Sequence, residues 1–273
     1  MNNEIKMIAL DLDGTLLTSD KKISDYTQQV LKNLHSAGIK VVLCTGRPIN
    51  AIWRFIKQLD LVGSEDYTIT FNGALVVEND NKAELFKQGL KKHDFDRLHQ
   101  FAQRVHAPLD LLDFEQAYSL TDLKPSNYQN QFKPGVLHFE AENYADISDQ
   151  DEFPKAVMCD SPSLLDEYLA QLPAEANKHY HIVRSQPIIT EFLAMDMDKQ
   201  VGLSHLLNHF GWDFSNLMTF GDAENDMGMI KAAGTGGVVM KNGQPQMLEI
   251  ADVVTDFDND HDGVAHYLET AFG

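Results

Sequence analysis

Two kinds of hydrophobic pattern alternate along both ends of the chain. Short apolar runs, typical of buried parallel strands, end at glycine or acidic residues. Between them, apolar residues recur at helical spacing, and the first such stretch has Ser24 as a cap and Gly38 as a stop. The predicted strands are Lys6–Leu10, Lys40–Cys44, Tyr67–Phe71, Leu217–Phe220 and Gly237–Met240, and the predicted helices are Ser24–Ala37, Pro48–Leu59, Lys199–Phe210, Glu224–Ala233 and Gly263–Phe272. This order predicts an α/β fold with a Rossmann-like, doubly wound parallel sheet.

The pattern changes near Ala83. The following stretch mixes predicted helices at Asp94–Val105 and from Ser161 to Gln171 with short extended segments, and residues 124–151 are polar, acidic and hard to assign. We therefore expect residues 1–83 and 187–273 to form one discontinuous core domain. Residues 84–186 are expected to form an inserted α+β domain.

Charge restricts the classes of partner. The chain has 273 residues, with 22 basic and 41 acidic ones, so its formal net charge is 22 − 41 = −19. Such a surface repels nucleic acid and anionic membranes. A phosphorylated substrate would also be repelled unless a local site reverses the field. If the partner is a small-molecule phosphate ester, a metal ion, a lysine and backbone N–H groups should therefore gather at one place. No nucleic acid, membrane or obligate protein partner is expected.

Cysteine usage and hydropathy indicate the cytoplasm. Two distant thiols, Cys44 and Cys159, give neither a disulfide framework nor metal-ligand spacing. The segment Met1–Leu10 lacks the apolar stretch of a signal peptide. No apolar run approaches the roughly 18 residues of a membrane helix.

An acidic cluster, Asp11–Thr15, directly follows the first predicted strand. Ligands bind at this end of doubly wound sheets. Asp11 is a reasonable nucleophile toward phosphorus, and Gly14 permits a turn whose N–H groups can meet an anion. Taken alone, the cluster is better explained as an Asx-rich turn that ends the strand.

A second acidic cluster, Gly221–Asp226, follows another predicted strand. Magnesium prefers oxygen ligands from one or two carboxylates, so Asp222 beside Asp11 would suit it. The alternative is a helix start with favourable acidic residues, which explains Asn225 and Asp226 less well.

Two further segments suit an anion. Thr45-Gly46-Arg47 follows the second strand and precedes a helix, where a hydroxyl and free N–H groups can hold phosphate. Lys199 opens a helix, against the preference of the helix dipole, which suggests pairing with Asp222, Asp226 or a phosphate. A simple turn and a solvated lysine are the alternatives.

In this order and spacing the motifs resemble those of haloacid dehalogenase-superfamily phosphatases of the Cof type, the branch of YidA-like sugar phosphatases. The matching segments are DLDGTLL (11–17), CTGRP (44–48), TFNGAL (70–75), DKQVGL (198–203) and GDAENDMGMI (221–230). The resemblance implies a Mg²⁺-dependent phosphatase that acts on sugar phosphates or similar metabolites. It also implies that the insertion is a mobile cap that selects the leaving group, for which His138, Arg184 and Lys155 are candidates, although surface charge is the simpler interpretation.

The resemblance also implies the site roles. Asp11 attacks phosphorus, Asp13 is general acid and then base, and Lys199 neutralises the nucleophile and the phosphate. The metal ligands would be Asp11, Asp13 through its carbonyl, and Asp222, with Asp226 and Asn225 in an outer shell. The phosphate would contact Gly14, Thr45, Gly46, Arg47, Lys199 and Asn225. A neighbouring phosphate and Asp11 are expected to raise the pKa of Asp13.

The chain departs from the family pattern at Gln200, where glycine is usual, and at Lys241, where a small or acidic residue is usual.

Two other functions remain open. A phosphotransferase or phosphosugar mutase would use the same aspartyl phosphate, and a non-catalytic sensor could use the same fold. The complete catalytic set argues against the sensor, and the lack of membrane spans argues against a pump.

Overall fold

The computed structural model describes residues 5–273 and divides the chain into two compact units. The core unit comprises the chain up to Lys87 together with Asp198–Gly273, and the insertion unit comprises Gln88–Met197. The first four residues of the expected segment 1–83 lie outside the described residues. Within residues 5–273, no helix has the length and apolar character needed to cross a bilayer.

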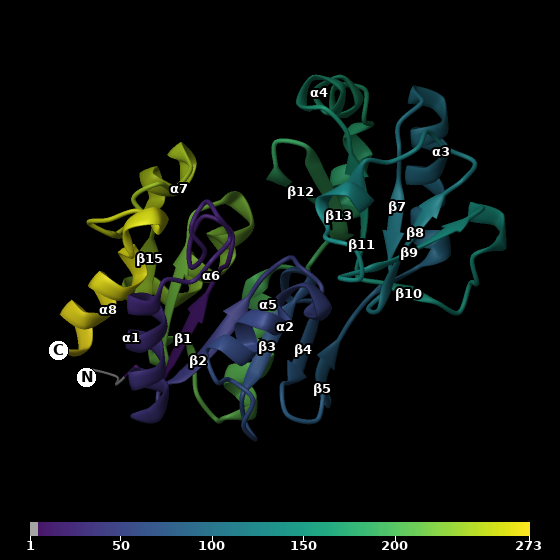
Figure 1. Ribbon diagram of the computed structural model, residues 1–273. Helices are drawn as coiled ribbons and strands as arrows, with labels where there is room; N and C mark the ends of the chain where they lie inside the picture. Colours follow the sequence, from purple (N-terminus) through teal and green to yellow (C-terminus); the bar gives the residue numbers. More distant parts are fainter. Residues whose placement is uncertain (1–4) are drawn as a thin grey trace. The chain divides into compact units, whose positions relative to one another are not determined.

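The core unit is built on an eight-stranded sheet in the order β16-β15-β14-β1-β2-β3-β4-β5 (Figure 1). Its strands are β1 (Met7–Leu10), β2 (Lys40–Cys44), β3 (Tyr67–Thr70), β4 (Leu75–Glu78), β5 (Glu84–Lys87), β14 (Leu217–Gly221), β15 (Gly237–Val239) and β16 (Val253–Val254). All neighbours from β16 to β3 are parallel, and β4 and β5 add an antiparallel edge. The predicted α/β fold with a doubly wound sheet is thus confirmed.

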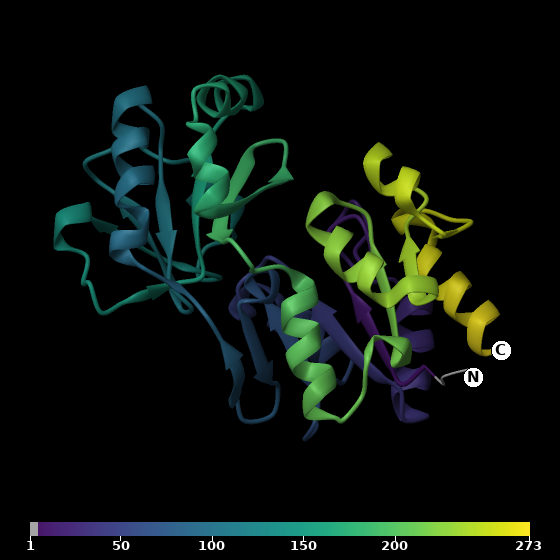
Figure 2. The same cartoon turned by 180° about the vertical axis from the view of Figure 1, so that it is seen from behind.

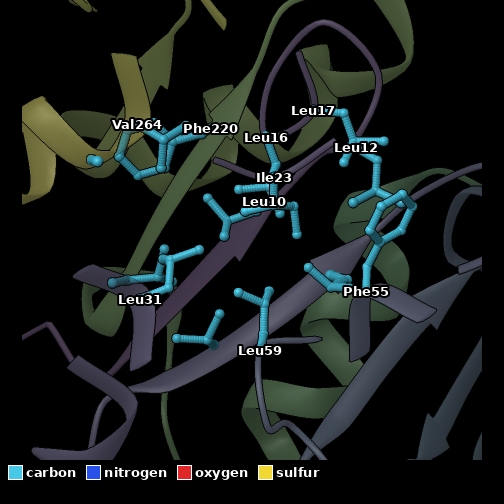
Figure 3. Packing of buried hydrophobic residues seen from close by; sticks show 14 of the residues in the cluster. Leu10, Leu12, Leu16, Leu17, Ile23, Leu31, Phe55, Leu59, Phe220 and Val264 are labelled. Atoms are coloured by element: carbon cyan, nitrogen blue, oxygen red, sulfur yellow. The ribbon is translucent and has the colours of Figure 1, made fainter. Parts of the chain in front are cut away.

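Helices cover both faces of this sheet, which explains its uninterrupted apolar strands. On β1, Ile8 and Leu10 join one apolar cluster, and Met7 and Ala9 join another. The first cluster includes residues from α1 (Asp25–Ser36), α2 (Ile49–Gln58) and α8 (Gly263–Phe272), and Figure 3 shows its packing. The second includes residues from α5 (Lys199–His209) and α6 (Met227–Ala233), the helices in front of the sheet in Figure 2.

The insertion unit has a six-stranded sheet in the order β12-β13-β11-β7-β8-β9. The strands are β7 (Asp110–Leu112), β8 (Gln116–Leu120), β9 (His138–Glu142), β11 (Lys155–Cys159), β12 (Tyr180–Gln186) and β13 (Ile189–Ala194), and a small separate sheet pairs β6 (Leu90–Lys91) with β10 (Glu152–Phe153). Its apolar core joins α3 (Asp96–Val105) and α4 (Pro162–Ala170) to the sheet. There Phe101 and Leu165 belong to one cluster with Ala156 and Phe192.

Both expected domain boundaries are corrected. The expected return to the core at residue 187 was wrong, because β13 pairs with β11 and β12 inside the insertion unit and the core resumes at Asp198. The expected start of the insertion at residue 84 was also wrong, because β5 pairs with β4 in the core sheet. In both places a hairpin partner, rather than a change in composition, determines where the strand belongs.

Candidate functional site

Asp11 and Asp222 follow two neighbouring parallel strands of the core unit. The strands β1 and β14 pair in register from Met7 opposite Leu217 to Leu10 opposite Phe220. The chain continues from β1 toward β2 and β3 on one side, and β14 leads to β15 and β16 on the other. This reversal is a topological switch point, where a crevice forms at the carboxyl ends of the strands. The Asp11 N–H donates to the Phe220 carbonyl at 3.0 Å, which fixes the two strand ends together.

Lys199 binds two carboxylates in the interior of the core unit. Its ammonium donates to Asp11 Oδ1 and, at 2.6 Å, to Asp226 Oδ1. Lys199 and Asp226 are fully buried, and Asp11 is only 5% exposed. The lysine at the start of α5 is therefore held by buried acidic partners, which offset its unfavourable position in the helix dipole.

Asp222 and Asp226 are positioned by the loop after β14. Asp226 Oδ2 accepts the N–H groups of Asp222 at 2.9 Å and of Ala223 at 3.1 Å. The Thr15 hydroxyl donates to Asp222 Oδ1 at 2.9 Å, which links the two acidic loops. Ligand oxygens of Asp11, Asp222 and Asp226 all lie within 4.8 Å of one another, a group that could hold a metal ion.

The charge balance of this group suits a cation. Three carboxylates lie close together and one ammonium group binds two of them, so negative charge remains in excess. Burial, followed by Asp226, raises the pKa of Asp222 to about 7, and burial raises the pKa of Asp11 despite the opposing charge of Lys199. Burial alone would lower the pKa of Lys199, but Asp11 and Asp226 raise it. Oxygen ligands with uncompensated negative charge fit a hard divalent cation such as Mg²⁺.

Asp13 is bound by cations. Arg47 grips it with two hydrogen bonds, Nε to Oδ2 at 2.6 Å and Nη2 to Oδ1 at 2.5 Å, and Lys21 Nζ lies 2.7 Å from Oδ1. Burial would raise the pKa of Asp13, but Arg47 and then Lys21 outweigh burial and lower it. The rise expected beside a bound phosphate stays a prediction, and in the protein without substrate these two cations lower the pKa instead. The sequence did not reveal that Arg47, expected on the phosphate, pairs with Asp13.

The remaining expected phosphate contacts lie beside these acidic loops. Thr45 is buried, and its hydroxyl accepts the Arg47 N–H at 3.2 Å. Gly46 lies directly against the side chain of Asn72, and the Asn225 amide donates to Asn72 Oδ1 at 3.3 Å. The loops after β2, β3 and β14 therefore meet.

Gly14 is confined at the other acidic loop. It has a φ of +84°, and a Cβ placed on it would lie 2.5 Å from Asp222 Oδ2. Its carbonyl accepts the Asn242 amide at 2.8 Å, so the late loop that contains the departure at Lys241 also holds the first acidic loop. Glycine is thus required here both by conformation and by space.

Sequence reasoning missed four residues of this site, namely Thr15, Lys21, Asn72 and Asn242. Thr15 and Asn72 lie within the motifs at 11–17 and 70–75, so their place after strands β1 and β3 was a usable signal. Asn242 follows Lys241 in the late loop of the family pattern, so its place there was also a usable signal. Lys21 gave no signal, because only the folded loop brings it to Asp13.

The candidate contacts in the insertion unit differ in their surroundings. Lys155 is buried and pairs with Glu191 on the neighbouring strand β13, so its interpretation as surface charge was wrong. Arg184 pairs with Asp166, and its guanidinium also binds the carbonyl of Pro187. His138 is exposed at the start of β9.

Comparison with known proteins gives consistent matches over nearly the whole chain. The sequence profile of haloacid dehalogenase-like hydrolases matches residues 8–268. A Bacillus subtilis protein named "Putative phosphatase YxeH" is 31% identical over 265 residues, covering 96% of this chain and 97% of the relative. The 5-amino-6-(5-phospho-D-ribitylamino)uracil phosphatase YcsE of the same organism is 29% identical over 263 residues, covering 96% and 94%.

Solved structures agree with the fold. The crystal structure of a haloacid dehalogenase-like hydrolase from Bacteroides thetaiotaomicron is 28% identical and superposes with a TM-score of 0.83, covering 98% of this chain and all of that one. The crystal structure of TM0651 from Thermotoga maritima, at 24% identity and a TM-score of 0.81, has the same fold over 97% of each chain.

Proposed function

Because the chain belongs to the haloacid dehalogenase-like hydrolase family, we propose that it is a magnesium-dependent phosphatase of small phosphate monoesters, working through Asp11. Its relatives include proteins named as phosphatases. The observation that carries the proposal is the buried pairing of Asp11 with Lys199, beside Asp222, at the switch point of the sheet. A nucleophile, a cation for its charge and a second carboxylate are the groups that phosphoryl transfer needs at one place.

In the first half of the reaction, a carboxylate oxygen of Asp11 bonds to phosphorus, and the bond from phosphorus to the ester oxygen breaks. Lys199 holds Asp11 Oδ1, which orients the other oxygen toward phosphorus. Asp13 gives its proton to the departing alcohol oxygen. In the second half, Asp13 takes a proton from water, whose oxygen attacks phosphorus and releases inorganic phosphate and the Asp11 carboxylate.

Asp11, Asp222 and the carbonyl of Asp13 would hold Mg²⁺, which when bound offsets the negative charge of the phosphoryl group. Asp226 suits a supporting role, because its oxygens already accept Lys199 and two backbone N–H groups. Thr45, Gly46 and Asn225 would bind the phosphoryl oxygens. The −19 net charge is thereby countered locally by Lys199, Arg47 and the metal ion.

For the substrate we propose a sugar phosphate or polyol phosphate. Support comes from the name of the relative YcsE, which specifies a phosphorylated ribityl chain. The test is phosphate release from a panel of sugar, polyol, nucleotide and cofactor phosphates, with and without Mg²⁺. Isomerised sugar phosphate with little free phosphate would instead identify a mutase.

The decisive variant is Asp11→Asn, which removes the nucleophile. We expect its turnover to be lost while its circular dichroism matches that of the wild-type protein. Acid-quenched wild-type enzyme should carry label from a radiolabelled phosphate ester, and hydroxylamine should release it as from an acyl phosphate. Wild-type turnover by Asp11→Asn would overturn the proposed role of this residue.

A further inference from the structure

The segment Phe71–Gly73, which directly follows β3, has an unusual backbone. Phe71, Asn72 and Gly73 have φ values of 51°, 55° and 103°. A left-handed conformation costs most side chains about 1 kcal/mol or more, and it persists only where the surroundings enforce it. Two consecutive non-glycine residues in this conformation, inside a buried part of the core unit, therefore need an explanation.

The surroundings of the segment enforce this conformation. The Asn72 N–H donates to the Thr45 carbonyl at 3.0 Å. At Gly73, an added Cβ would lie 2.0 Å from the carbonyl oxygen of Asp198, the residue that caps the helix of Lys199. The turn thus packs between the loop after β2 and the start of α5, both of which carry groups of the proposed site.

The Asn72 side chain connects the same loops. It is 2% exposed, and a Cβ placed on Gly46 would lie 2.8 Å from its Oδ1 and 3.0 Å from its Nδ2. Its Oδ1 accepts the Asn225 amide at 3.3 Å. A single buried amide therefore sets both the position of the Gly46 backbone and the direction of the Asn225 side chain.

We propose that Asn72 is a positioning residue for the phosphoryl group, acting through Gly46 and Asn225. This inference rests on the proposed function, in which those two residues bind the phosphoryl oxygens. Asn72 holds the Gly46 N–H and the Asn225 side-chain amide in position before the phosphoryl group binds. Less conformational entropy is therefore lost on binding. The backbone strain is then the cost of placing this amide between the loops.

The main test is Asn72→Gly, because glycine adopts the left-handed conformation without strain, while the whole side chain with its amide is removed. We expect the inhibition constant of inorganic phosphate and the KM of the substrate to rise about tenfold, as when one hydrogen bond to a charged group is lost, with a smaller change in kcat. Asn225→Ala should give a similar rise. The double variant should be less impaired than the two single effects multiplied together, since Asn72 acts partly through Asn225 and partly through Gly46.

Asn72→Asp provides a second variant in case Asn72→Gly does not fold. Aspartate tolerates the left-handed conformation and keeps an oxygen for Asn225, but it places a negative charge beside Gly46. We expect phosphate affinity to fall at least tenfold, because like charges repel at a partly desolvated site. An unchanged inhibition constant in either folded variant would overturn the proposal, as would fully additive effects with Asn225→Ala.

Asn79→Ala is a matched control from the same unit. Asn79 is also buried, and its amide donates to the Leu61 carbonyl at 2.8 Å, away from the acidic loops. This variant should lower the melting temperature and leave phosphate inhibition unchanged. Calorimetric binding of inorganic phosphate with Mg²⁺ separates the two proposals. Loss of phosphate binding in Asn72→Gly supports the positioning role of Asn72, even if the wild-type protein hydrolyses no ester. If the wild-type protein is an active phosphatase and Asn72→Gly binds phosphate equally well, the positioning role is overturned and the proposed function stands.

Discussion

The guanidinium of Arg47 donates two hydrogen bonds, of 2.6 and 2.5 Å, to the carboxylate of Asp13. Together with Lys21 it lowers the pKa of Asp13 against the effect of burial. A general acid, however, must hold a proton when the leaving oxygen departs. Arg47 therefore opposes the first role proposed for Asp13, which gives a prediction about the pH dependence of the enzyme.

We expect Arg47→Gln to move the alkaline limb of the kcat/KM profile to higher pH. Removing the cation raises the pKa of Asp13, so its protonated form persists to higher pH. Lys21→Gln should shift the limb in the same direction by less, because the Lys21 side chain is half exposed. The measurement compares an alkyl phosphate with a nitrophenyl phosphate, whose leaving oxygen needs little protonation. A limb that stays in place or moves to lower pH would contradict the acid role of Asp13.

A second prediction concerns Gly14. Gly14→Ala adds a Cβ at a φ of +84° and 2.5 Å from Asp222 Oδ2, so the Asp222 carboxylate must move. Gly38→Ala is the matched control, since Gly38 has a φ of +97° and nothing within 4 Å of the added atom. Both variants should lose about 1 kcal/mol of unfolding free energy from backbone strain.

Only Gly14→Ala should also lose Mg²⁺ binding and turnover, by tenfold or more, because only there does the new atom displace a carboxylate. Calorimetric titration with Mg²⁺ and a phosphate-release assay measure the two effects. Equal Mg²⁺ affinity in both variants would show that the close contact of Gly14 with Asp222 has no functional role.

The apolar pattern revealed the central strands of the core because helices cover both of their faces. The strands β5 (ELFK) and β9 (HFEAE) carry charged residues, so neither showed a continuous apolar run. The strand β4 (LVVE) does contain a short apolar run, and it was missed although this signal was present. The helix α7 (Pro245–Ile250) was missed because six residues are too few for a periodicity to show.

The acidic clusters were predictable for a related reason. Residues that follow neighbouring parallel strands must meet at one edge of the sheet, so Asp11 and Asp222 could be placed together from the chain alone. The partners of Asp13 could not. Arg47 was assigned to phosphate because charge identifies a cation but not which anion its long side chain reaches.

A third prediction concerns the pH dependence of Mg²⁺ binding. Burial and Asp226 raise the pKa of Asp222 to about 7, so the carboxyl group is largely protonated at pH 6. Protonation competes with a cation, and the apparent affinity for Mg²⁺ should therefore rise by up to about tenfold from pH 6 to pH 8. Calorimetry without substrate measures this, and Asp222→Asn should remove both the affinity and most of its pH dependence. Affinity that does not change with pH would exclude Asp222 as a ligand that must lose its proton.

The same group affects stability in the absence of metal. Between its ordinary pKa near 4 and about 7, the folded protein keeps a proton on Asp222 that the unfolded chain has lost. The unfolding free energy of the metal-free protein should therefore fall as pH rises through this window. Saturating Mg²⁺ should restore stability most strongly above pH 7, which a series of melting curves can show.

A last prediction concerns the insertion unit, where Asp110 is fully buried on β7. Burial raises its pKa to about 6, although hydrogen bonds from Ser126 and Ser119 oppose the rise. From about pH 4 to pH 6 the folded state binds the proton more tightly than the unfolded chain does, so the unfolding free energy should fall by roughly 3 kcal/mol as pH rises, and stay level above.

Asp110→Asn removes the ionisable group, so this pH dependence should disappear, and the variant should be more stable than the wild-type protein at pH 8. We expect a gain of about 1 to 3 kcal/mol, because the amide needs no ionisation but must itself be buried. Urea unfolding at pH 4 and pH 8, followed by circular dichroism, measures the effect. The exposed Glu175→Gln in the same unit is the control, and it should leave both values unchanged. If the unfolding free energies of Asp110→Asn and of the wild-type protein showed the same pH dependence, Asp110 would ionise in the folded protein without a cost in free energy. Its burial would then not raise its pKa.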